Sequence, residues 1–125
     1  MKLLVDSKAF IWAYVKPTEL SAAAQLAFRD PANERFISMA ALWEIAIKAS
    51  TGKLSMPAGP SQAIADLALT VLPISLPHVE RIPSLPFHHR NPFDRMMIAQ
   101  AMEEGLTIVT RDRIFSAYGV PVLTA

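Results

Sequence analysis

Short apolar runs alternate along the chain with longer segments whose apolar positions recur at helical spacing. The short runs are bounded by polar residues, Gly or Pro and predict strands at Lys2–Val5, Arg35–Ser38, Val71–Ser75, Leu106–Val109 and Val120–Leu123. The longer segments predict helices over Ser7–Val15, Ser21–Arg29, Met39–Ser50, Ser61–Thr70, Pro77–Ile82, Pro92–Glu104 and Asp112–Tyr118. Short strands separated by helices indicate an α/β fold with a mainly parallel sheet covered on both faces.

Proline, glycine and asparagine mark where several of these elements begin and end. Asn91 is a good N-cap for the helix that follows it, and Gly105 ends that helix. Lys53–Pro60 and Pro83–Asn91 are predicted loops. We expect the final strand at a sheet edge, because Pro121 has no N–H group to donate to a neighbouring strand.

The 125 residues suffice for one hydrophobic core, so we expect a single domain over residues 1–125. The chain has no cysteine, which excludes disulfides and thiolate metal sites and fits a cytoplasmic location. The longest uncharged run, Leu67–Val79, contains two prolines and is too short to span a membrane. Asp6 interrupts the apolar start of the chain, which argues against a signal peptide.

Two acidic residues follow predicted strands. Asp6 comes directly after Lys2–Val5, and Asp112 follows Leu106–Val109 with two residues between. Sites in open α/β sheets form at the carboxyl ends of the strands, so both acids belong where a site is expected. Taken singly, each also has a structural explanation as a helix cap.

Two further acids lie on predicted helices. Asp94 occupies the third position of its helix, where a negative charge also stabilises the helix dipole by roughly 0.3–1 kcal/mol. Glu44 lies in MAALWEIAIKA, a segment that is apolar almost all round, in which an unpaired carboxylate is unfavourable. An ion pair with Lys48, four residues later, is the alternative for Glu44, and such pairs contribute only about 0.2–0.5 kcal/mol on a surface helix.

Together the four carboxylates indicate a metal site. Two carboxylates about 4 Å apart repel by about 4 kcal/mol at an effective dielectric of about 20, so a converging cluster requires a cation. Hard oxygen ligands, no cysteine and few histidines favour Mg²⁺ or Mn²⁺ over zinc. A divalent ion with water in its open positions can generate a hydroxide and stabilise a phosphoryl group, which is the chemistry of phosphodiester hydrolysis.

Three blocks of the chain resemble the PIN-domain ribonucleases, specifically the VapC-type toxins of type II toxin–antitoxin systems. The blocks are MKLLVDSKAFIWA, ALWEIAIKASTGKL and HHRNPFDRMMIAQAMEEGLTIVTRDRIFSAYGVPVL, and the similarity runs from residue 1 to about 123. The resemblance implies a three-layer α/β/α sandwich around a central, mainly parallel sheet. It also implies a Mg²⁺-dependent endoribonuclease that cuts single-stranded or looped RNA, forms homodimers and is silenced by a small cognate antitoxin.

By position, the resemblance carries the family's acids onto Asp6, Glu44, Asp94 and Asp112, which become the candidate catalytic residues. Our hypothesis is that Asp6 and Asp94 are direct metal ligands and that Asp112 contributes through a second metal or a water. Glu44 is expected to position the metal or its bound water.

Two positions depart from the family's usual pattern. Where D-T-H or D-T-N is common, this chain has Asp6-Ser7-Lys8, in which Ser7 retains the hydroxyl. Lys8 either contacts substrate phosphate or pairs with an acid and weakens metal binding, and a solvent-facing lysine is the structural alternative. Asn91 stands where an aspartate is frequent. Ser7, Lys8 and Arg111 are the candidate substrate-binding residues.

His88 and His89 are interpreted as loop histidines, because a closed zinc site needs more soft ligands than the chain offers. Contact of one of them with RNA is the alternative. Four aromatic residues are interpreted as core or interface residues rather than base-stacking platforms, since no aromatic RNA-recognition motif is present: Trp12, Trp43, Phe93 and Phe115.

Other functions remain open at this point. A catalytically weak or inactive PIN-fold binding module, acting with its antitoxin in regulation, stays possible because of Lys8. A metal-dependent phosphatase would need a second Asp two residues after a nucleophilic one, and Lys8 occupies that place. A DNA nuclease would use the same acids.

Overall fold

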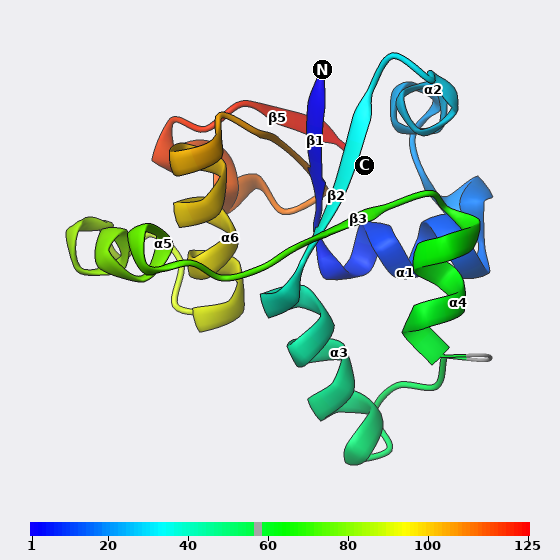
Figure 1. The fold of residues 1–125 in the computed structure, drawn as a ribbon, viewed down its shortest axis with the longest axis horizontal. Helices are drawn as coiled ribbons and strands as arrows, with labels where there is room; N and C mark the ends of the chain where they lie inside the picture. The colour runs from blue at the N-terminus through cyan, green and yellow to red at the C-terminus, as the bar shows by residue number, and fades with distance from the viewer. Residues whose placement is uncertain (57–58) are drawn as a thin grey trace.

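The computed structural model describes residues 1–56 and 59–125, and a sheet of five parallel strands runs through its centre (Figure 1). The strands are β1 (Lys2–Val5), β2 (Glu34–Ser38), β3 (Thr70–Leu72), β4 (Thr107–Thr110) and β5 (Val122–Thr124). Their order in the sheet is β3-β2-β1-β4-β5, so β1 is central: Leu4 is paired with Phe36 on one side and Ile108 on the other. The predicted α/β class with a parallel sheet is therefore confirmed.

Helices cover both faces of this sheet. The α-helices are α1 (Ser7–Val15), α2 (Ala22–Arg29), α3 (Met39–Ser50), α4 (Gly59–Asp66), α5 (Leu76–Arg81) and α6 (Pro92–Glu104). Short 3₁₀ turns are η1 (Pro17–Glu19), η2 (Ile82–Ser84) and η3 (Arg113–Tyr118). In Figure 1, α5 and α6 lie to one side of the strands and α1, α2 and α4 to the other, which gives the expected α/β/α layers.

The core forms where these layers meet the central strands. Leu3, Leu4 and Val5 of β1 are fully buried, as are Ile108 and Val109 of β4. Strands that are apolar at successive positions, rather than at alternate ones, are suited to a sheet with both faces covered. Packing therefore fixes the carboxyl ends of β1 and β4. The positions of Asp6 and Asp112, which follow these strands, are set by this packing.

Several predicted boundaries match the structure residue for residue, including those of β1, α1, α3 and α6. The α6 match has a clear cause: Asn91 Oδ1 accepts hydrogen bonds from the N–H groups of Phe93 and Asp94, and Gly105 ends the helix at φ 66°. The edge position expected for the final strand, which follows Pro121, is also confirmed.

The segment before β3 differs from the prediction. The helix expected over Ser61–Thr70 is α4, which ends at Asp66, and the left-handed backbone of Ala68 (φ 52°) turns the chain into β3. The strand ends at Leu72, before Pro73, because proline cannot continue the ladder. The loop expected over Lys53–Pro60 includes residues 57–58, outside the described residues, and its last two residues begin α4.

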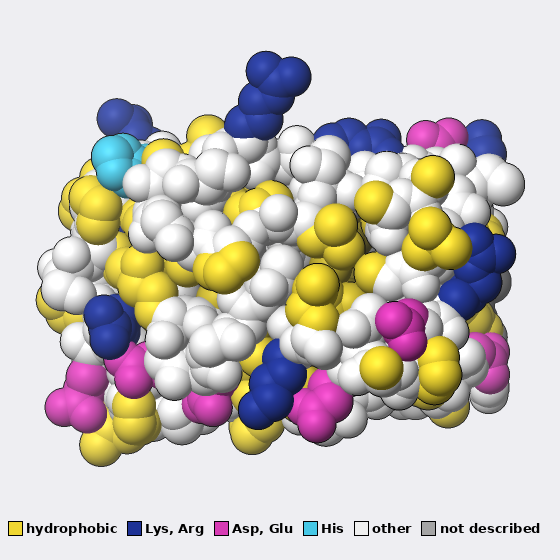
Figure 2. Space-filling view, turned by 90° about the horizontal axis from the view of Figure 1, so that it is seen from above, with side chains coloured by type: hydrophobic (Ala, Val, Ile, Leu, Met, Phe, Trp, Pro, Cys, Tyr) yellow, Lys and Arg dark blue, Asp and Glu magenta, His cyan; other side chains and the backbone are white. Residues whose placement is uncertain are grey.

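Figure 2 looks onto the end of the molecule from which β1 and β2 start. Lys, Arg, Asp and Glu side chains are scattered there among apolar ones, without a gathering of one charge. The predicted site belongs to the opposite end, where these strands finish. No helix in the described part of the chain is long and apolar enough to cross a membrane.

Candidate active site

All four predicted acids line one cavity, about 360 Å³ in volume, at the carboxyl end of the sheet. Asp6 follows β1, Asp112 follows β4, Glu44 projects from α3 and Asp94 from the first turn of α6. The other lining residues are Ser7, Lys8, Trp12, Lys48, Asn91, Arg111 and Phe115. Four segments that are far apart in the sequence thus bring their carboxylates to a single place.

Asp6 is both a helix cap and a lining residue of the cavity. Its Oδ1 accepts a 2.8 Å hydrogen bond from the N–H of Ala9, which caps α1. Its Oδ2 accepts a 2.6 Å hydrogen bond from the Thr110 hydroxyl, and the same hydroxyl oxygen accepts one from the N–H of Asp112 at 3.0 Å. Burial raises the pKa of Asp6, the two hydrogen bonds oppose this, and the nearby charges of Asp112 and Glu44 add to it.

Glu44 is only 6% exposed, and its carboxylate is contacted from α1, from the residue that caps α6 and from its own helix. The Ser7 hydroxyl donates to Oε1 at 2.6 Å, and the Asn91 side-chain amide donates to Oε2 at 3.1 Å. The predicted alternative, an ion pair with Lys48, is also present, with Nζ 3.7 Å from Oε2. The donors at Ser7 and Asn91 offset part of the desolvation that burial imposes on a carboxylate.

Asn91 makes two contacts at once, of which an aspartate at this position could make only one. Its Oδ1 caps α6 while its Nδ2 donates to Glu44. An aspartate would retain the cap but place a second negative charge against Glu44 instead of a donor. Asparagine at this position therefore leaves less repulsion in the cavity than an aspartate would.

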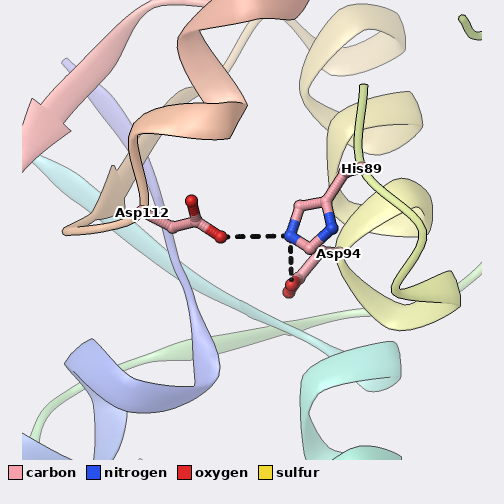
Figure 3. Close-up of side chains that lie close together, drawn as sticks. All are labelled: His89, Asp94 and Asp112. Carbon is pink, nitrogen blue, oxygen red and sulfur yellow. Dashed lines mark hydrogen bonds and ion pairs between the residues drawn. The ribbon is translucent and has the colours of Figure 1, made fainter. Parts of the chain in front are cut away.

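His89 joins Asp94 and Asp112 directly (Figure 3). Its Nε2 lies 2.8 Å from Asp94 Oδ2 and 3.1 Å from Asp112 Oδ2. One potential ligand atom from each of these three side chains lies within 4.8 Å of the other two. The second oxygen of Asp112, Oδ1, accepts a hydrogen bond from the N–H of Ile114 and so caps η3.

The protonation of Asp94 depends on its burial and on its charged neighbours. Burial raises the pKa of Asp94 to about 7; His89 opposes this rise, while Glu44, Asp6 and Asp112 add to it. A carboxyl group with such a pKa is poorly compensated as an anion. Added positive charge in the cavity would relieve this, and the carboxylate oxygens around it are the ligands that Mg²⁺ and Mn²⁺ prefer. The residues present therefore fit a divalent cation.

The three candidate substrate-binding residues all line the cavity but differ in what they contact. The Ser7 hydroxyl is directed to Glu44. Lys8 is exposed. The Arg111 guanidinium donates to the backbone carbonyls of Ala125, at 3.1 Å, and Glu19, and it lies over the Trp12 ring at 4.3 Å. Arg111 thus ties the C-terminal end of the chain to α1 and η1.

His89 and Thr110 were not singled out as site residues from the sequence. His89 lies in an irregular stretch without periodicity, so its side-chain direction had no sequence signal beyond its position five residues before Asp94. Thr110 had one available signal, since it occupies the position after the buried Val109 at the carboxyl edge of β4. Its hydroxyl connects Asp6 to the backbone of Asp112.

Comparison with known proteins gives a family and a fold. A family model described as PIN domain matches residues 3–121. The solved structure of VapBC2 from Rickettsia felis bound to a promoter DNA fragment superposes with a TM-score of 0.70 at 16% identity, covering 98% of each chain. DNA-bound VapBC from Salmonella typhimurium gives a TM-score of 0.68 at 18% identity, covering 98% of this chain and 97% of that one.

A third structure, FitAcB from Neisseria gonorrhoeae, gives a TM-score of 0.63 at 17% identity, covering 98% of this chain and 96% of that one. At these identities the structures support a shared fold. No curated protein sequence matches the chain significantly.

Proposed function

Because the chain belongs to the PIN-domain family, we propose that it is a Mg²⁺- or Mn²⁺-dependent endoribonuclease that acts as a VapC-type toxin. One observation carries the proposal: the carboxylates of Asp6, Glu44, Asp94 and Asp112 reach one cavity from four separate segments. The raised pKa of Asp94, about 7, supports this proposal, because it indicates that the acids in the cavity lack compensating positive charge.

The four acids divide into two roles in this proposal. Asp6, Asp94 and Asp112 would hold the cation, which when bound supplies positive charge beside the phosphodiester and a water of lowered pKa. Glu44 would orient the attacking water, because the donors of Ser7 and Asn91 fix the direction of its carboxylate. Hydrolysis then yields two RNA fragments from one strand.

The proposed RNA substrate would meet two lysines at the cavity. Lys8 is exposed, and the Lys48 side chain is 50% exposed. Both can reach phosphate oxygens as flexible point charges. Arg111 was also a candidate for binding the substrate. Its guanidinium already contacts two backbone carbonyls and the Trp12 ring, so its main contribution is to hold the end of the chain.

Protein partners are the second part of the proposal. Large apolar side chains are exposed on α3, on α5 and in the loop before α6, including Trp43 at 60%, Leu76 at 69% and Phe87 at 80%. A cavity of about 440 Å³ beside them is lined mainly by apolar groups. Exposed apolar area of this kind supports burial against protein, here a second copy of the chain or a small cognate antitoxin.

The proposed location is the cytoplasm, which the absence of cysteine from the sequence favours.

The test of the enzymatic proposal is Asp94→Asn. This variant should lose Mg²⁺-dependent cleavage of RNA while keeping its circular dichroism spectrum and its cooperative unfolding. A substrate panel of single-stranded RNA, structured RNA and DNA separates the ribonuclease from a DNA nuclease. Cleavage of RNA by Asp94→Asn at the wild-type rate would rule out the assignment of Asp94.

An inactive or weakly active binding module is the second candidate, and the exposed Lys8 at the cavity favours it. In this candidate its ammonium group would compete with a cation for the same acids. Calorimetric titration of Mg²⁺ and Mn²⁺ into the wild type and Lys8→His separates the candidates. Absence of binding in the wild type, with binding in Lys8→His, would support the binding module.

A further inference from the structure

His89 lies in the loop that precedes α6 and is held by three contacts, one to its backbone and two to its ring. Its backbone N–H donates a 2.8 Å hydrogen bond to the Tyr118 hydroxyl. Its ring meets the Phe115 ring edge-on, with the centroids 5.7 Å apart. The N–H of Asn91 donates to its Nδ1 at 3.3 Å. The side chain is 13% exposed, so these contacts hold a largely buried imidazole against Asp94 and Asp112, which line the cavity.

The contact at Nδ1 determines which ring nitrogen carries the proton. Because Nδ1 accepts from Asn91, the proton of the neutral ring is on Nε2. The Nε2–H group then donates to Asp94 Oδ2 at 2.8 Å and to Asp112 Oδ2 at 3.1 Å (Figure 3). One donor thereby serves two carboxylates that come from different elements.

These two carboxylates would otherwise move apart. Asp94 belongs to α6 and Asp112 to the turn after β4, and like charges at short range repel. A donor between them offsets the repulsion and keeps the two oxygens facing the same point. Hydrogen bonds of this kind orient ligating carboxylates, and loss of such a partner typically lowers metal affinity about 10–100-fold.

We propose that His89 is a positioning residue, whose Nε2–H group holds the Asp94 and Asp112 carboxylates at the separation at which they bind a divalent cation. The inference rests on the proposed metal site and adds to it a residue outside the four acids. Before a metal binds, the Asp94 and Asp112 carboxylates are already held together by His89.

Binding of Mn²⁺ to the full chain tests this without reference to RNA cleavage, by electron paramagnetic resonance and by calorimetry. In His89→Phe, which retains an aromatic ring against Phe115, we expect the Mn²⁺ dissociation constant to rise about 10–100-fold. In His89→Gln, whose side-chain amide restores an N–H donor, it should stay within about threefold of the wild type. His88→Phe is the matched control, since His88 is exposed and contacts the Tyr118 ring rather than the acids.

Unfolding curves confirm that each variant is folded, and His89→Leu replaces His89→Phe if the larger ring is not tolerated. An unchanged Mn²⁺ affinity in the donorless variant would overturn the proposal, and so would equal losses in His89→Phe and His89→Gln. Electron spin-echo measurements on the wild-type Mn²⁺ complex should show no imidazole ¹⁴N coupling. Such a coupling would make His89 a ligand itself and refute the positioning role.

The failure of this inference can be distinguished from that of the proposed function. If wild-type protein binds no Mn²⁺ or Mg²⁺, the metal dependence of the enzyme is wrong and the role of His89 falls with it. If the wild type binds Mn²⁺ and His89→Phe binds it equally well, only the role of His89 is wrong.

Discussion

The Ser7 hydroxyl donates a 2.6 Å hydrogen bond to Oε1 of Glu44, which joins the first residue of α1 to the middle of α3. Both side chains are buried, at 8% and 6% exposure. The hydroxyl that this chain shares with the family's usual threonine therefore contacts another site residue. Ser7 is in a position to fix Glu44 rather than to face the substrate.

Replacing Ser7 by alanine should leave Glu44 Oε1 buried without this donor. We expect Ser7→Ala to lose about 1–3 kcal/mol of unfolding free energy. RNA cleavage should slow about tenfold, corresponding to about 1.4 kcal/mol of barrier. Urea unfolding and single-turnover cleavage measure the two effects. Ser7→Thr, which keeps the hydroxyl, should behave like the wild type; if Ser7→Ala does too, the hydrogen bond has no role.

Thr110 offers a second test of how the acids are held. Its hydroxyl donates to Asp6 Oδ2 at 2.6 Å and accepts from the N–H of Asp112 at 3.0 Å. Thr110→Val keeps the shape but removes both bonds, so stability should fall by about 1.5–3 kcal/mol, the range for hydrogen bonds to charged groups. Thr110→Ser is the control. Equal stability of Thr110→Val and the wild type in urea would contradict this account.

The stability of the metal-free protein should depend on pH because of Asp94. Its pKa is about 7 in the folded chain and about 3.8 in the unfolded one. Between these values the folded state binds more protons, so unfolding free energy should decrease as pH rises from about 4 to above 7. The raised pKa of Asp6 acts in the same direction.

Urea unfolding with a chelator at pH 5 and pH 8 measures this dependence. Asp94→Asn mimics the neutral acid, so its stability should change less with pH and should exceed that of the wild type at pH 8. Added Mg²⁺ should recover stability in the wild type at pH 8 by binding the folded state. Parallel pH profiles for wild type and Asp94→Asn would show that Asp94 does not cause the dependence.

Lys8 should contribute to RNA affinity through charge alone. It is exposed at the cavity, so Lys8→Ala should leave unfolding free energy nearly unchanged. Each phosphate contact to a single strand contributes about −0.7 to the slope of log affinity against log salt. Loss of Lys8 should therefore reduce the magnitude of that slope by about 0.7. Fluorescence anisotropy measures this slope, with Lys8→Ala introduced into the non-cleaving Asp94→Asn variant so that the RNA stays intact. An unchanged slope would show that Lys8 does not contact the RNA.

Much of the fold followed from local patterns. The boundaries of α6 were predictable because Asn91, Pro92 and Gly105 act within a few residues of the helix ends they define. The segment from Ser61 to Ser75 was predicted less well, since apolar periodicity did not reveal the left-handed backbone at Ala68. That conformation is stabilised by its surroundings and is uncommon for a residue with a Cβ atom.

The sequence by itself determined that Asp6 and Asp112 lie at one edge of the sheet. Buried parallel strands end at a common edge, and the residue after a strand must lie there. Only the tertiary structure decided three contacts. His89 bridges Asp94 and Asp112. The Thr110 hydroxyl connects Asp6 with Asp112, and the Arg111 guanidinium donates to backbone carbonyls. Patterns in the sequence specify which face of an element is buried. The direction of a polar side chain in a loop depends instead on partners that packing brings from distant segments, and local patterns carry no record of them.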